Sequence, residues 1–167
     1  DNLNAINMDM FHKMWTFLTE WARDDEVKCV IVRGAGEKSF CAGGDVLAVV
    51  KNRGDAEYMH EVYRCEYVVD QLIHRYPKPF IPLMDGIVMG GGAGISVHAQ
   101  GRRLVTERTI FAMPETALGL FPDIGASHFL SKAPGAIGMY MGLTGTRLDA
   151  ADTIFVGVAD YCLPSST

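Results

Sequence analysis

Hydrophobic residues mark two long helices in the first half of the chain. Four of them recur at steps of four, three and four after Asn7, a residue type that favours the N-cap of a helix. These four are Met10, Met14, Phe17 and Trp21. A second helical stripe runs through residues 56–76 and ends where Pro77 and Pro79 interrupt the hydrogen-bond ladder.

Short apolar runs between polar breaks predict strands. Residues 28–34 form one such run and residues 80–84 another, in which Pro82 indicates a sheet edge or a bulge. We expect further strands near 104–105, 110–111 and 158–163, and short helices from residue 46, over 93–99, 124–131 and 136–143, and after Asp149. Because strands alternate with helices, the sequence predicts a single α/β domain over residues 1–167.

Composition narrows the classes of partner. With 49% hydrophobic and 21% charged residues, the chain is typical of a globular domain. A net charge of −5 argues against nucleic acid as a nonspecific partner but leaves docking into a larger assembly open, and no apolar run is long enough to cross a bilayer. The four cysteines and five histidines are scattered without a zinc-binding spacing, so we expect no metal site.

Two glycine-rich turns are the most distinctive feature of the sequence. They cover residues 40–45 and 89–92, and each lies between a strand-like and a helix-like stretch. Each turn alone is typical of a tight chain reversal. Together, at helix starts, they favour binding of an anionic oxygen by backbone N–H groups. A nucleotide-binding loop does not fit, because residues 90–94 lack the GxGxxG spacing.

Three carboxylates are candidates for chemistry beside such an oxygen. Glu115 and Asp123 each follow a proline within an apolar stretch, where desolvation would raise the pKa and suit proton transfer. Either could instead cap the next turn, with Asp123 as the N-cap of the following helix. Glu66 lies on the apolar stripe of the second helix, where an ion pair with Arg or Lys is the alternative. His98 and His128 are expected to be structural.

At these residues the chain resembles the crotonase (enoyl-CoA hydratase/isomerase) superfamily. The resemblance rests on residues 34–45, 84–92 and 111–123, in that order, and covers nearly the whole chain. It implies a spiral of ββα units that binds acyl-CoA. The thioester oxygen would be held by two backbone N–H groups, and Gly44 and Gly91 occupy the matching positions.

Within this superfamily the chain is similar to the subgroup that hydrolyses 3-hydroxyisobutyryl-CoA, a step of valine degradation. Family hydratases use two glutamates, and this chain has Gly94 at the first position and Glu115 at the second. The missing carboxylate argues against addition of water to a double bond. The Phe-Pro-Asp motif that ends at Asp123 and the Glu66-Tyr67 pair resemble the hydrolases, in which the corresponding residues contact the substrate.

The resemblance implies a mechanism of thioester hydrolysis. The N–H groups of Gly44 and Gly91 would stabilise the oxyanion, while Glu115 would either attack the carbonyl carbon or activate a water molecule. Asp123 would orient Glu115 or the water. Glu66 would accept a hydrogen bond from the 3-hydroxyl group of the acyl chain. No cofactor is implied beyond the coenzyme A of the substrate.

The same resemblance leaves other functions open. The family's first strands would lie before Asp1 and its last helices beyond Thr167, so we expect a partial domain. Some hydrolase-like members are structural subunits of the mitochondrial small ribosomal subunit, which makes a scaffold the main alternative; hydration or isomerisation of enoyl-CoA is the lesser one. A mitochondrial location is expected, with either a homo-oligomer or docking into a ribosomal assembly.

Overall fold

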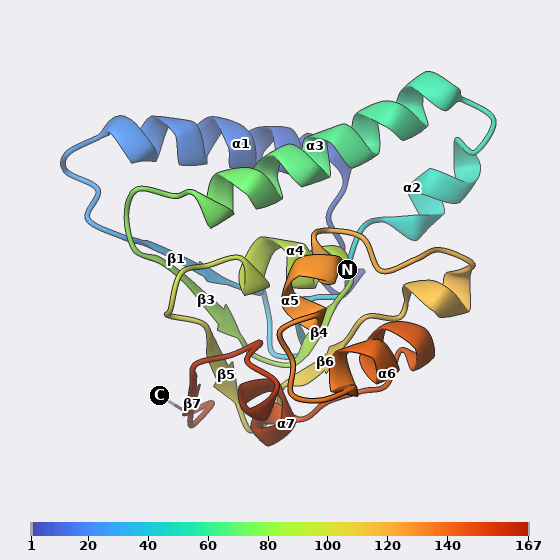
Figure 1. Ribbon diagram of the computed structural model, residues 1–167. Coiled ribbons are helices and arrows are strands. Elements are labelled where there is room, and N and C mark those ends of the chain that lie inside the picture. Colours follow the sequence, from blue (N-terminus) through green and yellow to red (C-terminus); the bar gives the residue numbers. More distant parts are fainter. Residues whose placement is uncertain (1, 167) are drawn as a thin grey trace.

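The chain forms two parallel β-sheets in a computed structural model that describes residues 2–166. The larger sheet has the order β1-β3-β5-β7 and the smaller sheet the order β2-β4-β6. The strands are β1 (Val30–Arg33), β2 (Ser39–Cys41), β3 (Phe80–Met84), β4 (Ile87–Met89), β5 (Leu104–Thr106), β6 (Ile110–Ala112) and β7 (Tyr161–Leu163). From β1 to β6, successive strands enter different sheets, which confirms the predicted α/β class and its spiral of repeated units (Figure 1).

Two long helices cover one side of the strands (Figure 1). α1 (Met8–Arg23) and α3 (Ala56–His74) pack side by side, and α4 (Gly91–Val97) contacts both α3 and strands of the two sheets. The other helices are α2 (Val46–Lys51), the 3-10 helix η1 (Glu115–Leu118), α5 (Ala126–Leu130), α6 (Ile137–Thr144) and α7 (Ala150–Phe155). None of the helices in the described part of the chain is long and apolar enough to cross a membrane.

Capping side chains determine where several helices begin. Asn7 accepts a hydrogen bond from the Met10 amide at the start of α1, as predicted. Asp149 accepts from the Asp152 amide at the start of α7. Because the first N–H groups of a helix have no partner within it, a polar side chain just before the first turn stabilises that start.

The buried face of α1 differs from the predicted stripe. Phe11 and Leu18 belong to the core, whereas Met10, Phe17 and Trp21 are each at least 38% exposed. The exposed residues line a groove beside β1 instead. α1 carries apolar residues on more than one face, so their spacing alone does not identify the face that packs.

The predicted position of Pro82 at a sheet edge or bulge is wrong. β3 lies between β1 and β5, and Pro82 is in register with Val32 of β1. The ladder between β3 and β5 begins only at Leu83. The proline therefore lies in an interior strand, before the second neighbouring strand has started.

Candidate active site

The two glycine-rich turns meet where β2 and β4 end. These strands are parallel neighbours, so the turns that follow them leave the sheet at the same edge. A Cβ placed on Gly91 would lie 3.2 Å from the Gly44 nitrogen, which shows how closely the turns approach. Neither the Gly44 nor the Gly91 amide donates a hydrogen bond to another residue within 2–166. Both amides lie at one cavity and are available to a ligand oxygen.

Backbone conformation and the close approach of two glutamates together favour glycine at these turns. A Cβ on Gly91 would collide with Oε1 of Glu66. A Cβ on Gly90 would lie 3.1 Å from Oε1 of Glu115, and Gly90 also has a positive φ of 48°. Only a residue without a side chain combines that backbone conformation with such close contacts.

Glu66 is held inside the site by α3. Its side chain is 6% exposed, and no salt bridge to it occurs within the described residues, so the ion-pair interpretation is not supported. Burial, with Asp123 and Glu115 nearby, raises the pKa of Glu66 to about 8. An acid in this environment is mainly neutral at pH 7.

Glu115 is the first residue of η1. It is 5% exposed, and its Oε2 atom has no hydrogen-bond partner within the described part of the chain. Burial is the main reason that the pKa of Glu115 rises to about 7, and the charge of Asp123 adds to it. A carboxyl group with a pKa near neutrality exchanges protons readily at physiological pH.

Asp123 faces the site from the loop after η1. Its Oδ2 atom accepts a hydrogen bond of 2.7 Å from the Tyr67 hydroxyl of α3. The alternative interpretation as a helix N-cap is wrong, because α5 begins at Ala126 after Gly125 and has no side-chain cap. The Asp123 side chain thus bonds to α3 and does not cap α5.

One cavity of about 410 Å³ brings the predicted residues together. All five predicted site residues line it, namely Gly44, Glu66, Gly91, Glu115 and Asp123. Apolar side chains of α2 and α3 complete the wall, among them Val49 and Val62. The cavity therefore combines two amide donors, three carboxyl groups and an apolar surface.

Asp70 is a buried acid that the sequence analysis did not single out. It is 5% exposed, and neither carboxyl oxygen has a partner within residues 2–166. Burial, then the charges of Glu66 and Asp123, holds the pKa of Asp70 well above its ordinary value. Its oxygens lie 2.8 and 2.9 Å from where a Cβ on Gly94 would be. Its position four residues after Glu66, on the same helix face, is the signal that could have identified it.

One set of metal-binding residue types gathers outside the site, between α1 and α3. His12, Glu61 and Cys65 bring their ligand atoms within 4.8 Å of one another. Arg64 donates to both carboxylate oxygens of Glu61, at 2.7 Å each. This ion pair already uses the carboxylate, so we assign no metal to the group.

Known proteins provide three comparisons for the whole chain. A curated relative, the mitochondrial 3-hydroxyisobutyryl-CoA hydrolase of Danio rerio, is 44% identical over 98% of this chain and 43% of its own length. The small ribosomal subunit protein mS47 of Neurospora crassa is also 44% identical, over 98% of this chain and 33% of its own. A solved structure described as an enoyl-CoA hydratase from Rhodobacter sphaeroides has a TM-score of 0.95 at 40% identity, over 99% of this chain and 49% of that chain.

The chain spans less than half the length of these proteins. Within that span, the match covers at least 98% of this chain, and the fold of the solved structure agrees closely. The family profile described as Enoyl-CoA hydratase/isomerase matches residues 1–167. The chain therefore belongs to the enoyl-CoA hydratase/isomerase family.

Proposed function

We propose that this chain carries the site of a coenzyme A thioester hydrolase that acts on 3-hydroxyisobutyryl-CoA. The observation that carries the proposal is the meeting of the Gly44 and Gly91 amides with Glu115 in one cavity. A thioester oxygen bound by both amides would bring its carbonyl carbon close to Glu115. The hydrolase of Danio rerio supports the choice of acyl group.

The two amides would stabilise the negative charge that develops on the thioester oxygen. The turns fix both nitrogens before substrate binds, so little reorganisation is needed as the reaction proceeds. Loss of one such donor typically lowers kcat by about 10²–10³-fold.

Glu115 would supply the nucleophilic or basic group. It either attacks the carbonyl carbon to form an anhydride, which water then hydrolyses, or removes a proton from the water that attacks directly. In both routes the carbon–sulfur bond breaks. In the anhydride route coenzyme A leaves as a thiolate and takes its proton from water, whereas in the direct route Glu115 can pass on the proton that it removed from the water. Asp123 would orient Glu115 or the water, and Tyr67 holds Asp123 in turn.

Glu66 would recognise the hydroxyl group of the acyl chain. Its buried carboxyl lies over Gly91, next to the proposed position of the thioester oxygen. A buried polar group that binds a substrate hydroxyl disfavours substrates without one, because it then stays unpaired. This supports a hydroxyacyl rather than a plain acyl thioester.

Hydrolysis fits the site better than hydration does. Gly94 of α4 carries no carboxyl group, and the carboxyl of Asp70 fills the space beside it. Asp70 lines a second cavity and not the one that contains Gly44 and Gly91. The chain thus lacks the carboxylate that the resemblance assigns to hydratases at position 94.

The test is release of coenzyme A from 3-hydroxyisobutyryl-CoA by the full-length protein and its Glu115→Gln variant. We expect kcat to fall at least about a hundredfold, since proton transfer by a positioned side chain contributes about 10²–10⁴-fold. Glu57→Gln is the matched control, because Glu57 is exposed in the first turn of α3. Unchanged turnover by Glu115→Gln would overturn the assignment.

A structural subunit of a mitochondrial small ribosomal subunit is the second candidate. The mS47 protein of Neurospora crassa favours it, because its identity to this chain equals that of the Danio rerio hydrolase. Sedimentation of the full-length protein with small ribosomal subunits, alongside the hydrolysis assay, separates the two. Co-sedimentation without turnover favours the scaffold, and turnover without co-sedimentation favours the enzyme. Both candidates are consistent with a mitochondrial location.

A further inference from the structure

The turn that carries Asp123 has an unusual backbone. Ile124 has a positive φ of 44°, and Gly125 follows with a φ of 75°. A β-branched residue in the left-handed region is sterically unfavourable, so contacts from the surrounding structure must hold it there. Ile124 is 2% exposed, so these contacts lie inside the protein.

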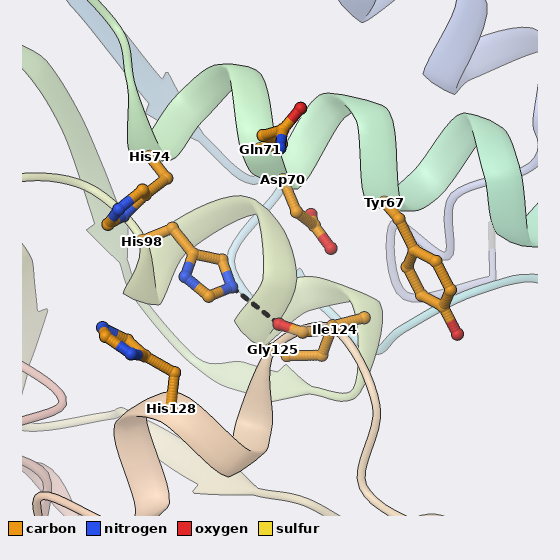
Figure 2. A pocket seen from close by; sticks show the side chains of 8 residues that line it. All are labelled: Tyr67, Asp70, Gln71, His74, His98, Ile124, Gly125 and His128. Carbon is orange, nitrogen blue, oxygen red and sulfur yellow. Dashed lines mark hydrogen bonds between the residues drawn. The ribbon is translucent and has the colours of Figure 1, made fainter.

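His98 supplies the main polar contact to this turn. Its Nε2–H donates a hydrogen bond of 2.6 Å to the Ile124 carbonyl oxygen (Figure 2). The imidazole packs against Gly125, where a Cβ would lie 2.8 Å from Cε1 of His98. Burial lowers the pKa of His98, so the ring remains neutral at physiological pH. The ring and the turn therefore fit one another closely.

α4 joins this contact to the glycine-rich turn. The helix begins at Gly91, whose N–H group is one of the two proposed hydrogen-bond donors to the thioester oxygen. His98 is the C-cap residue at the other end of the helix. All seven helical residues are buried, and the helix is about 10 Å long at 1.5 Å per residue. A short helix that is packed on every side moves little. It thus fixes the separation between the Gly91 amide and the Asp123 turn.

We propose that His98 is a positioning residue for Asp123. Its hydrogen bond to Ile124 holds the turn of residues 123–125 in one conformation. In that conformation Asp123 accepts a hydrogen bond from the Tyr67 hydroxyl and faces the same cavity as Glu115. His98 touches neither the cavity nor the reacting atoms and acts through the backbone of Ile124. The catalytic part of this inference rests on the proposed hydrolase function.

The first experiment measures the turn itself and needs no substrate. The Ala126 amide donates to the Asp123 carbonyl oxygen across 2.7 Å, so its hydrogen-exchange rate reports on this turn. In the full-length protein we expect His98→Ala to speed exchange at Ala126 roughly tenfold, the effect of losing one buried hydrogen bond. His98→Gln, whose amide reaches a similar position, should restore protection. His60→Ala is the control, because His60 is exposed on α3 and makes no side-chain hydrogen bond to another described residue.

The second experiment measures kcat for 3-hydroxyisobutyryl-CoA in a double-mutant cycle. We expect His98→Ala to lower kcat with little change in KM, and His98→Gln to recover it. In an Asp123→Asn background, His98→Ala should have no further effect, since it acts only through Asp123. An equal loss in both backgrounds, or unchanged exchange at Ala126, overturns the proposal. A wild-type protein without turnover refutes the hydrolase function, while hydrogen exchange still tests the turn.

Discussion

The Tyr67 hydroxyl donates a hydrogen bond to Oδ2 of Asp123, at 2.7 Å, and this bond lies between two cavities. Asp123 lines the larger cavity with Glu115, and Tyr67 lines a second cavity of about 250 Å³ (Figure 2). Burial and the bond to Asp123 raise the pKa of Tyr67, so it keeps its proton and remains a donor. A side chain that lines the second cavity therefore holds the carboxyl group of an acid that lines the larger one.

Replacing Tyr67 by phenylalanine is expected to lower kcat roughly tenfold, because one hydrogen bond of Asp123 is lost while the ring remains. KM and the melting temperature should change little. Tyr140→Phe is the control, since Tyr140 is exposed on α6 and its hydroxyl makes no hydrogen bond to another described residue. Equal losses in both variants would contradict the role of the Tyr67–Asp123 bond.

Gly91→Ala is expected to abolish most of the activity. The added methyl group would collide with Oε1 of Glu66 and lie 3.2 Å from the Gly44 nitrogen, in the space proposed for the thioester oxygen. We predict a fall in kcat/KM of about 10²-fold or more, as for loss of a donor to the oxyanion. Gly54→Ala meets no atom of residues 2–166 within 4 Å and is the control. Steady-state kinetics and circular dichroism distinguish lost activity from lost folding.

Asp70→Asn is expected to stabilise the protein, and increasingly so as pH rises. The folded state holds the pKa of Asp70 well above its ordinary value of 3.8, so it binds a proton that the unfolded chain releases. Stability therefore falls as pH rises from the unfolded pKa towards the folded one, and asparagine removes this loss.

Thermal unfolding near pH 5 and near pH 8 tests this prediction. We expect a gain in Tm of about 3 °C or more at the higher pH and less at the lower one. Asp25→Asn, at an exposed position after α1, should leave Tm unchanged at both. The same shift at both pH values would show that Asp70 does not act through its proton.

Hydrolysis is expected to rise with pH and level off above neutrality. Burial and Asp123 raise the pKa of Glu115 to about 7, and both proposed roles of Glu115 require its ionised form. The value of kcat/KM for 3-hydroxyisobutyryl-CoA should therefore increase through about pH 7. Release of the coenzyme A thiol, followed at constant ionic strength, gives this profile. A profile that is flat between about pH 6 and 8 would indicate that Glu115 has an ordinary pKa.

Local chemistry explains which elements the sequence could predict. The range predicted for α3 is correct except that it ends two residues late. The prediction succeeds because the capping of the helix start and the prolines after its end are short-range signals. Asn7 and Asp149 cap helices as expected for the same reason. The glycine-rich turns were recognisable because a close approach to the main chain leaves few alternatives to glycine.

Tertiary contacts explain what the sequence could not show. β2 and β4 were not predicted as strands, because each is short and runs directly into a glycine-rich turn. Asp70 lies four residues after Glu66, but an acid on a helix is usually solvated, and packing is needed to show that both its oxygens are buried. The distance between Gly91 and the Asp123 turn depends on α4 and is not encoded by spacing in the chain.

The buried acids around α3 also affect the electrical properties of the whole protein. Glu66 and Asp70 have raised pKa values, so folding takes up protons from the buffer at neutral pH. The folded chain then carries less negative charge than the −5 given by its composition. In native isoelectric focusing it should migrate to a pH above the sequence value of about 5.5, and return towards that value when unfolded in urea.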